Sequence, residues 1–280
     1  MKQLIERPEY LENLISFMNT KIIKVVTGIR RCGKSTLFDL FIEYLKKNGV
    51  DEKQIIRVNL ENPDYFEIDD HHKLYKLIKD KISDDKMNYI FIDEVQLIPK
   101  FQKAVDGLFI QENCDLYITG SNAFILSGEL ATLLSGRYVE IKMLSLSFKE
   151  YYSIYPSNQN LERLYDQYIH NSSFPYTIEI QDKKNVRQYL SSIYDSVVLK
   201  DIVARKKIAN TNVLQRVIRF MFDNVGNLIS VKKIADTLTS AGQKISTHTV
   251  ETYLEAMVES FVMYRVARYD VKGRQHLKTG

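Results

Sequence analysis

Residues 27–36 read TGIRRCGKST, and this stretch decides which fold the chain adopts. From Gly28 to Ser35 it fits the pattern G-x-x-x-x-G-K-[ST], which average residue usage produces in about one chain per hundred of this length. The run KIIKVVTG (21–28) before it predicts a buried strand, and residues 34–48 after it carry apolar side chains at helical spacing. A glycine-rich loop there points its backbone N–H groups at the start of a helix. The stretch therefore predicts a phosphate-binding loop.

The residues of this loop are expected to bind the phosphates of a nucleotide. They are Gly28, Ile29, Arg30, Arg31, Cys32, Gly33, Lys34, Ser35 and Thr36. We expect Lys34 to reach the β- and γ-phosphates, Ser35 to ligate Mg²⁺ and Thr36 to bond the α-phosphate. The side chains of Arg30 and Arg31 reach either acidic neighbours or phosphates, and both interpretations stay open. A plain strand-turn-helix with a solvated Lys34 is the alternative, and the context favours phosphate binding.

The run NYIFIDE (88–94) delivers two acids to the carboxyl end of a predicted strand. Ligands of open α/β sheets bind at that edge. An aspartate placed there, Asp93, is expected to hold Mg²⁺, and Glu94 is expected to polarise the attacking water as general base. The alternative for Glu94 is that it caps the next helix.

Two further residues are candidates for catalysis. Asn122 ends the next strand in TGSN (119–122), where it either contacts the attacking water or γ-phosphate or forms a turn. Arg137 starts a later strand, where it is either a surface ion pair or an arginine finger, often supplied by a neighbouring subunit. Because no N-K-x-D string occurs, ATP is expected rather than GTP.

The first half of the chain alternates short β-rich runs with helical patterns, which predicts a mostly parallel α/β sheet flanked by helices, the P-loop fold. The further strands are expected at 54–60, 88–94, 115–122 and 137–143, and a helix at 71–82.

Beyond about residue 145 the pattern becomes helical. Helices are expected at 161–170, 183–207, 211–224, 231–242 and 247–261, followed by a hairpin over 264–278. Three helices and a hairpin are the order of a winged helix-turn-helix. The domains expected are a P-loop ATPase domain at 1–145, a helical lid or linker at 146–208 and a winged helix domain at 209–280.

Composition limits the class of protein. The chain has 280 residues, 45% of them hydrophobic and 26% charged, with a net charge of +4, which is ordinary for a globular protein and too mild to demand nucleic acid. Only two cysteines are present, so no disulfide framework is expected and the cytoplasm is the expected compartment. No apolar run approaches the ~20 residues of a membrane span.

Several motifs in a familiar order resemble a family of prokaryotic AAA+-type ATPases, in which an N-terminal P-loop domain precedes a C-terminal domain of unknown function. They are TGIRRCGKST, IFIDEVQ, TGSNAFILSGELATLLSGRYVEI, LSFKEY, LKDIVARKKI and ISVKKIADTLTSAGQKISTHTVETYLEAMVESFVMYRVARYDVKG, which together cover nearly the whole chain. The resemblance implies Gly28 to Thr36 as phosphate loop, Asp93 and Glu94 as metal and water residues, Asn122 as sensor and Arg137 as finger. It places Arg7, Tyr10 and Leu11 near the adenine.

The chain departs from that family in two places. The family usually has Gly-Gly-Phe-Pro where this chain has Ser172, Ser173, Phe174 and Pro175. Family members usually continue past the wing into a nuclease-like domain, whereas this chain ends at HLKTG. No paired-carboxylate nuclease motif is found, so no nuclease activity is expected.

The helix that a winged helix would place in the DNA groove carries Glu251, Glu255 and Glu259 at a spacing that puts them on one face. Three carboxylates repel a polyanion, so this helix is not expected to read bases. Positive charge gathers instead around the wing, at Arg265, Arg268, Lys272, Arg274 and Lys278. These side chains suit either non-specific phosphate contacts or an acidic protein partner, and protein contact or self-association is favoured.

We therefore expect Mg²⁺-dependent ATP binding and hydrolysis, coupled to movement of the C-terminal winged-helix region. The alternative is a nucleotide-gated switch or scaffold with slow hydrolysis that binds a protein or DNA partner. Expected partners are ATP, a second copy of the chain, a protein, and DNA touched non-specifically through the wing; no membrane contact is expected.

Overall fold

The computed structural model describes residues 5–83, 85–121, 134, 136–156, 159–197, 202–203, 208 and 210–266. The chain forms two compact units, Met1–Asp201 and Ile202–Gly280. Within the described residues, no helix combines the length and apolar character needed to cross a lipid bilayer.

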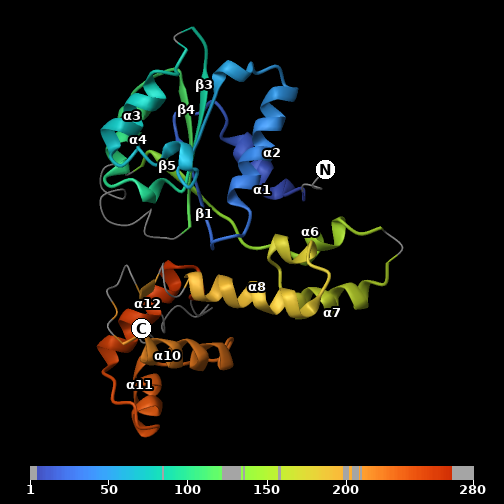
Figure 1. Ribbon diagram of the computed structural model, residues 1–280, viewed down its shortest axis with the longest axis vertical. Helices are drawn as coiled ribbons and strands as arrows, with labels where there is room; N and C mark the ends of the chain where they lie inside the picture. The colour runs from blue at the N-terminus through green and yellow to red at the C-terminus, as the bar shows by residue number, and fades with distance from the viewer. Residues whose placement is uncertain are drawn as a thin grey trace, which may run out of the picture. The chain divides into compact units, whose positions relative to one another are not determined.

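A five-stranded parallel sheet forms the centre of the first unit (Figure 1). Its strands are β1 (Ile23–Thr27), β2 (Ile55–Asn59), β3 (Asn88–Asp93), β4 (Cys114–Gly120) and β5 (Tyr138–Lys142), in the order β2-β3-β4-β1-β5. The expected parallel α/β sheet is thereby confirmed. The register aligns Thr27 with Gly120 and Asn59 with Asp93, so the loops that follow these strands leave the sheet at one edge.

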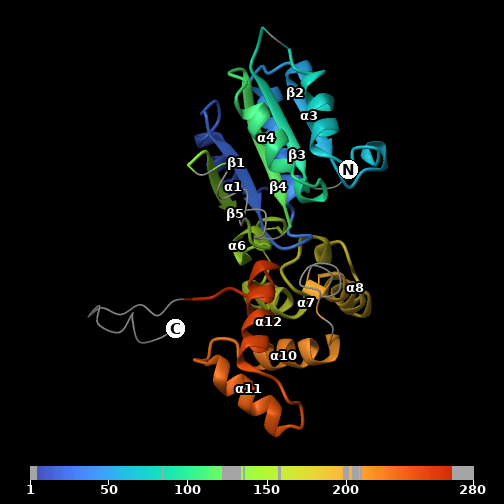
Figure 2. The same cartoon turned by 90° about the vertical axis from the view of Figure 1, so that its left-hand side faces the viewer.

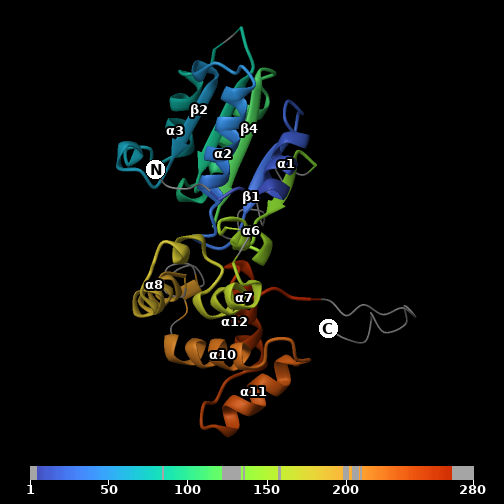
Figure 3. The ribbon, with the colours of Figure 1, turned by 90° about the vertical axis from the view of Figure 1, so that its right-hand side faces the viewer.

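Helices cover both faces of this sheet. Helices α3 (His71–Lys79) and α4 (Phe101–Phe109) lie on one face, seen from the front in Figure 2, and α1 (Pro8–Ser16) and α2 (Lys34–Lys47) lie on the other, seen in Figure 3. The strands read as continuous apolar runs because both faces are buried. Helices α2 and α3 are expected from the sequence pattern, whereas α1 and α4 are not.

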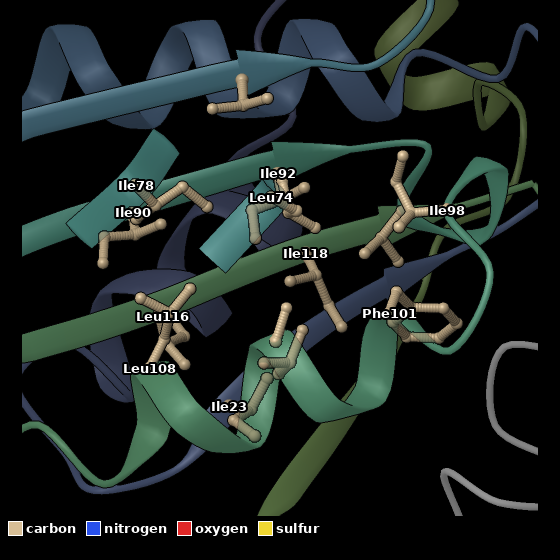
Figure 4. Packing of buried hydrophobic residues seen from close by; sticks show 14 of the residues in the cluster. Ile23, Leu74, Ile78, Ile90, Ile92, Ile98, Phe101, Leu108, Leu116 and Ile118 are labelled. Carbon is tan, nitrogen blue, oxygen red and sulfur yellow. The ribbon is translucent and has the colours of Figure 1, made fainter. Parts of the chain in front are cut away.

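Successive strand residues feed two separate apolar layers. Ile90 and Ile92 of β3 lie beside Ile78 and Leu74 of α3 (Figure 4). Phe91, between them in the chain, points to the opposite face, where its ring centroid lies 5.1 Å from that of Phe38 and 4.9 Å from that of Tyr117. This burial fixes the register, so each strand delivers a defined residue to the edge of the sheet.

The opposite, amino edge of the sheet holds a buried polar network. Lys24 of β1 forms an ion pair with Asp115 of β4, and the two residues are 0% and 2% exposed. The other oxygen of Asp115 accepts hydrogen bonds from the Asn19 N–H and the Tyr117 hydroxyl, both at 2.8 Å. Every carboxylate oxygen and the ammonium of this network has a partner, which is what a buried ion pair requires.

Helices that follow the sheet complete the first unit. They are α6 (Phe148–Ser153), α7 (Leu161–Asn171) and α8 (Lys183–Ser196), with short 3-10 turns at Glu52–Gln54, Pro63–Tyr65, Val95–Leu97 and Pro175–Ile178. Helix α8 ends at Ser196, and residues 198–201, 204–207 and 209 of this region lie outside the described part of the chain. The predicted helix over 183–207 is therefore followed only as far as α8.

The second unit contains α10 (Thr211–Asp223), α11 (Val231–Ser240) and α12 (Thr247–Glu259). Each begins with a side-chain cap, from Asn210, Ser230 and Ser246. These are the three helices expected of a winged helix-turn-helix. The expected wing, with Arg268, Lys272, Arg274 and Lys278, lies outside the described residues, so the winged helix stays a prediction.

Candidate functional site

The loop after β1 has a geometry that requires glycine at both ends. A Cβ on Gly28 would lie 2.2 Å from the carbonyl oxygen of Met143, so no side chain fits there. Gly33 adopts a left-handed φ of 103° as N-cap of α2, without a side chain capping the helix. The first N–H groups of α2 thus remain available to an anion.

Lys34 lies at the centre of this loop and is 4% exposed. Its ammonium donates hydrogen bonds to the carbonyl oxygens of Gly28, at 3.1 Å, and Ile29, at 3.3 Å. It also lies 3.6 Å from Oε1 of Glu94. The loop carbonyls and one carboxylate therefore hold a cation where the sequence predicts phosphate binding.

Asp93 ends β3 and is buried, 1% exposed. Its Oδ1 accepts a hydrogen bond from the Thr119 hydroxyl at 2.7 Å. Its Oδ2 lies 3.7 Å from Nη2 of Arg57 and has no hydrogen-bond partner within the described part of the chain. Burial raises the pKa of this carboxyl, against the opposing effects of the Thr119 hydroxyl, the Arg57 charge and the Ser35 hydroxyl. A buried carboxylate oxygen that lacks a hydrogen-bond partner and lies near Ser35 fits a hard cation such as Mg²⁺.

Glu94 follows in a left-handed conformation, with φ of 54°. Its N–H donates to the Thr119 hydroxyl oxygen at 3.0 Å, and its side chain caps no helix, so the alternative capping role is wrong. The amide of Gln96 donates to Oε2 of Glu94 and lies 3.3 Å from the hydroxyl of Ser121. Gln96 thus fixes one carboxylate oxygen while the other faces Lys34.

A pocket of about 620 Å³ opens over the loop. Its wall includes Lys34, Ser35, Thr36 and Glu94. The remaining wall comes from Ile5, Arg7, Arg30, Arg31, Gly33, Glu61, Leu146, Pro175, Tyr176, Glu179, Tyr189 and Ser196. The cavity is within the 300–1,000 Å³ range that is usual for small-molecule sites.

The two arginines inside the loop have different environments. Arg30 forms an ion pair with Glu61, which also lines the pocket, so its side chain reaches an acidic neighbour. Arg31 has a left-handed φ of 70°, and its charge opposes the rise in the pKa of Tyr189 that burial causes. Cys32 is fully buried and is therefore a packed loop residue, and this burial raises the pKa of its thiol.

The residues expected near the adenine are only partly brought to the pocket. Arg7 lines it, but its guanidinium bonds Glu150 at 2.6 Å and the carbonyl oxygens of Cys32 and Leu144 at 3.1 and 2.7 Å. Tyr10 accepts a hydrogen bond from the N–H of Leu144, and neither Tyr10 nor Leu11 is in the pocket wall. Arg7 therefore ties the N-terminal segment to the loop and to α6.

Arg137 does not join this group. Arg137 precedes β5, and its carbonyl oxygen accepts from Ile23 N–H at the start of β1, so it lies at the amino edge of the sheet. Its guanidinium pairs with Asp106 at 2.8 Å and stands over the Phe109 ring. Asn122 lies outside the described residues.

Three residues that contact Asp93 or Glu94 are not predicted from the sequence: Thr119, Gln96 and Arg57. Thr119 and Arg57 lie within strands, and the sequence feature that could have pointed to them is a polar residue inside an otherwise apolar run. Gln96 lies two residues after Glu94, the predicted general base, in a 3-10 turn that the sequence pattern does not predict.

Comparisons with known proteins agree with this geometry. Residues 20–152 match a family model described as an AAA domain, and residues 162–279 match a model described as a domain of unknown function. An uncharacterized protein of Haemophilus influenzae is 41% identical over 282 residues, covering 99% of this chain and 70% of its own length. An uncharacterized protein of Methanocaldococcus jannaschii is 27% identical over 267 residues, and the alignment covers 89% of this chain but only 57% of that relative.

Among solved structures, the Walker-type ATPase of Pyrococcus abyssi superposes with a TM-score of 0.60 at 15% identity, covering 91% of this chain and 89% of that one. At this identity the likeness concerns the fold alone.

Proposed function

Because the chain belongs to the AAA+-type P-loop ATPases, we propose that it binds ATP with Mg²⁺ and hydrolyses it in the pocket of its first unit. One observation carries the proposal. The buried ammonium of Lys34, the carboxylate of Glu94 and the Oδ2 of Asp93, which lacks a hydrogen-bond partner among the described residues, lie at the carboxyl edge of the sheet, beside the first N–H groups of α2. These are the charges that phosphoryl transfer to water needs.

Lys34 binds the phosphates by exchanging partners. In the unliganded protein two carbonyl oxygens and Glu94 surround its ammonium. A triphosphate in the loop offers anionic oxygens in their place, and a hydrogen bond to a charged group contributes about 1.5–3 kcal/mol. The N–H groups at the start of α2 bind the same oxygens.

Ser35 and Asp93 are the residues that would hold Mg²⁺. Ser35 lines the pocket, and Oδ2 of the buried Asp93 carboxylate has no hydrogen-bond partner among the described residues. When bound, Mg²⁺ neutralises charge on the β- and γ-phosphate oxygens. Thr119 orients the Asp93 carboxylate by its hydrogen bond to Oδ1.

Glu94 acts as general base on the attacking water. Once the phosphates draw Lys34 away, Oε1 of Glu94 is free to accept a proton from water, while Gln96 holds Oε2 in place. Gln96 is thus a positioning residue. Asn122 is the proposed sensor of the γ-phosphate.

Arg137 serves as a finger only toward a second copy of the chain. It lies at the amino end of β5, a strand of five residues, so about 16 Å of strand separates it from the carboxyl edge. It therefore acts on the phosphates of a neighbouring subunit, and self-association completes the site.

Turnover is coupled to the second unit through α8. Tyr189 and Ser196 of this helix line the pocket, and the second unit begins at Ile202, six residues after Ser196. A shift of α8 on nucleotide binding is passed along the chain to the winged-helix region.

The steady-state rate at which the protein releases phosphate from ATP tests the proposal. Glu94→Gln is expected to lower the steady-state rate by on the order of 10²- to 10⁴-fold, because the general base is lost. Nucleotide binding measured by calorimetry stays intact. Glu52→Gln removes an exposed carboxylate that pairs with Lys46 far from the pocket, and serves as the matched control. A Glu94→Gln variant that turns over at the wild-type rate contradicts the assignment.

A further inference from the structure

The second unit has a polar pocket of its own, of about 330 Å³. Its wall consists of Asn210, Asn212, Gln215, Arg216, Arg219 and Gln243. Two guanidinium groups and four amides line it, and no carboxylate does. This pocket shares no residue with the wall of the pocket over the phosphate loop.

Helix α10 builds most of this pocket through its amphipathic pattern. Val213, Leu214, Val217 and Ile218 are buried. The opposite face carries Asn212, Arg216 and Arg219, at i, i+4 and i+7, and all three are exposed. The apolar face packs into the second unit, so the polar face is exposed.

The turn after α11 supplies the last side chain. Gly242 has a left-handed φ of 82°, and the N–H of Gln243 donates to the carbonyl oxygen of Leu238 at 2.9 Å. This glycine turn ends α11 and brings Gln243 beside α10. The pocket is therefore formed by two segments of the fold.

The charge of the pocket is unbalanced. Across the described part of the chain, neither Arg216 nor Arg219 forms an ion pair with a carboxylate. Their Cβ atoms, three residues apart on one helix, are separated by about 5–6 Å. Two cations that close repel one another unless an anion lies between or beside them. Guanidinium and amide groups offer N–H donors, which match phosphate oxygens.

We propose that this pocket binds phosphate groups of a nucleic-acid backbone. Arginine, asparagine and glutamine are among the side chains that donate hydrogen bonds to nucleic-acid phosphates. The polar face from Asn212 to Arg219 extends about 10 Å along α10, so it follows a row of phosphates rather than one. Helix α12 is unsuited to the same role, because Glu251 and Glu255 are exposed on it. Nucleic acid thus approaches α10 rather than the expected recognition helix.

Fluorescence polarisation with a labelled DNA duplex and the full chain, without nucleotide, tests the proposal. Arg216→Ala/Arg219→Ala is expected to weaken duplex binding at least tenfold at low salt. It also lowers the slope of log K against log salt by about 2, since each lost phosphate contact contributes about 0.9. Lys232→Ala/Lys233→Ala removes the same charge from exposed positions of α11 outside the pocket, and is expected to change affinity less than about threefold.

Further measurements distinguish binding of a nucleic-acid backbone from binding of free phosphate, and distinguish a loss of binding from a loss of folding. Gln215→Glu puts a carboxylate into the wall and is expected to weaken duplex binding while far-UV circular dichroism and ATP affinity stay unchanged. Equal losses in the two double variants would show a general charge effect and overturn the proposal. Saturation by inorganic phosphate at concentrations that displace no duplex, or the absence of duplex binding, also overturns it.

Discussion

Both edges of the sheet in the first unit bury charged groups, but the two edges differ in how completely these groups are hydrogen-bonded. At the amino edge, Lys24 and Asp115 pair with one another, and Asn19 and Tyr117 occupy the remaining carboxylate oxygen. At the carboxyl edge, Asp93 keeps one oxygen without a hydrogen-bond partner among the described residues. The same strands, β1, β3 and β4, supply or border both edges.

The difference separates a structural network from a binding site. A buried charge is tolerated when its partners are complete, so the amino edge contributes to the fold without a ligand. An incomplete buried group costs free energy until something completes it. The carboxyl edge therefore lowers the free energy of unfolding when no ligand is bound, and binding of the proposed ligand raises it again.

The largest effect is expected from breaking the amino-edge pair. Lys24→Met leaves Asp115 as an uncompensated buried charge, which lowers the free energy of unfolding by about 3–5 kcal/mol. Denaturant unfolding measures this loss. Lys24→Met/Asp115→Asn keeps acceptors for Asn19 and Tyr117, removes the lone charge and should recover part of it. If Lys24→Met lowered the free energy of unfolding by less than about 1 kcal/mol, the proposed difference between the two edges of the sheet would be contradicted.

A smaller effect of opposite sign is expected at the carboxyl edge. Asp93→Asn removes the buried charge and should stabilise the protein without nucleotide by about 1–3 kcal/mol at neutral pH, because a carboxylate costs more to desolvate than a neutral amide. It should also impair Mg²⁺-dependent hydrolysis.

The pH dependence of that gain has a fixed sign. Burial raises the pKa of Asp93 above its ordinary 3.8, so the folded state binds this proton more tightly than the unfolded state. Below pH 3.8 the carboxyl is neutral in both states and wild type resembles Asp93→Asn. As the pH rises through the raised pKa, wild type loses stability relative to the variant, and the difference then levels off. A difference that shrinks with rising pH contradicts this account.

The smallest effect on stability is expected for Arg137→Ala. The side chains of its ion pair with Asp106 are partly exposed, so the variant should lower the free energy of unfolding by only about 0.2–1 kcal/mol. The rate of hydrolysis should fall only at concentrations where copies associate. Full activity of this variant across the whole concentration range would leave Arg137 as a surface ion pair.

The sequence predicts the sheet well because its information is local. Each strand is a short apolar run, and the glycine spacing around Lys34 marks the loop by itself. The partners of the site residues were not predictable, because they come from distant positions. Thr119 meets Asp93 only once β4 lies beside β3, and Arg57 does so only once β2 takes the edge of the sheet.

One departure from the related family also has a physical reading. Ser172 stands where the family usually has glycine, and it adopts φ of 76° and ψ of 159° after α7. That region of backbone space is nearly exclusive to glycine. The turn is therefore kept in shape despite the serine, and its carbonyl oxygen accepts a hydrogen bond from the Thr177 hydroxyl at 3.3 Å.

Calorimetric titration of Mg²⁺ and ATP into wild type, Lys34→Ala and Lys47→Ala tests the central claim most directly. Lys47 lies exposed at the far end of the same helix and controls for loss of charge. The account predicts that wild type and Lys47→Ala bind ATP with equal affinity, while Lys34→Ala binds at least about tenfold more weakly, since one charge-assisted hydrogen bond is lost. Equal affinity of all three proteins would contradict nucleotide binding at this loop.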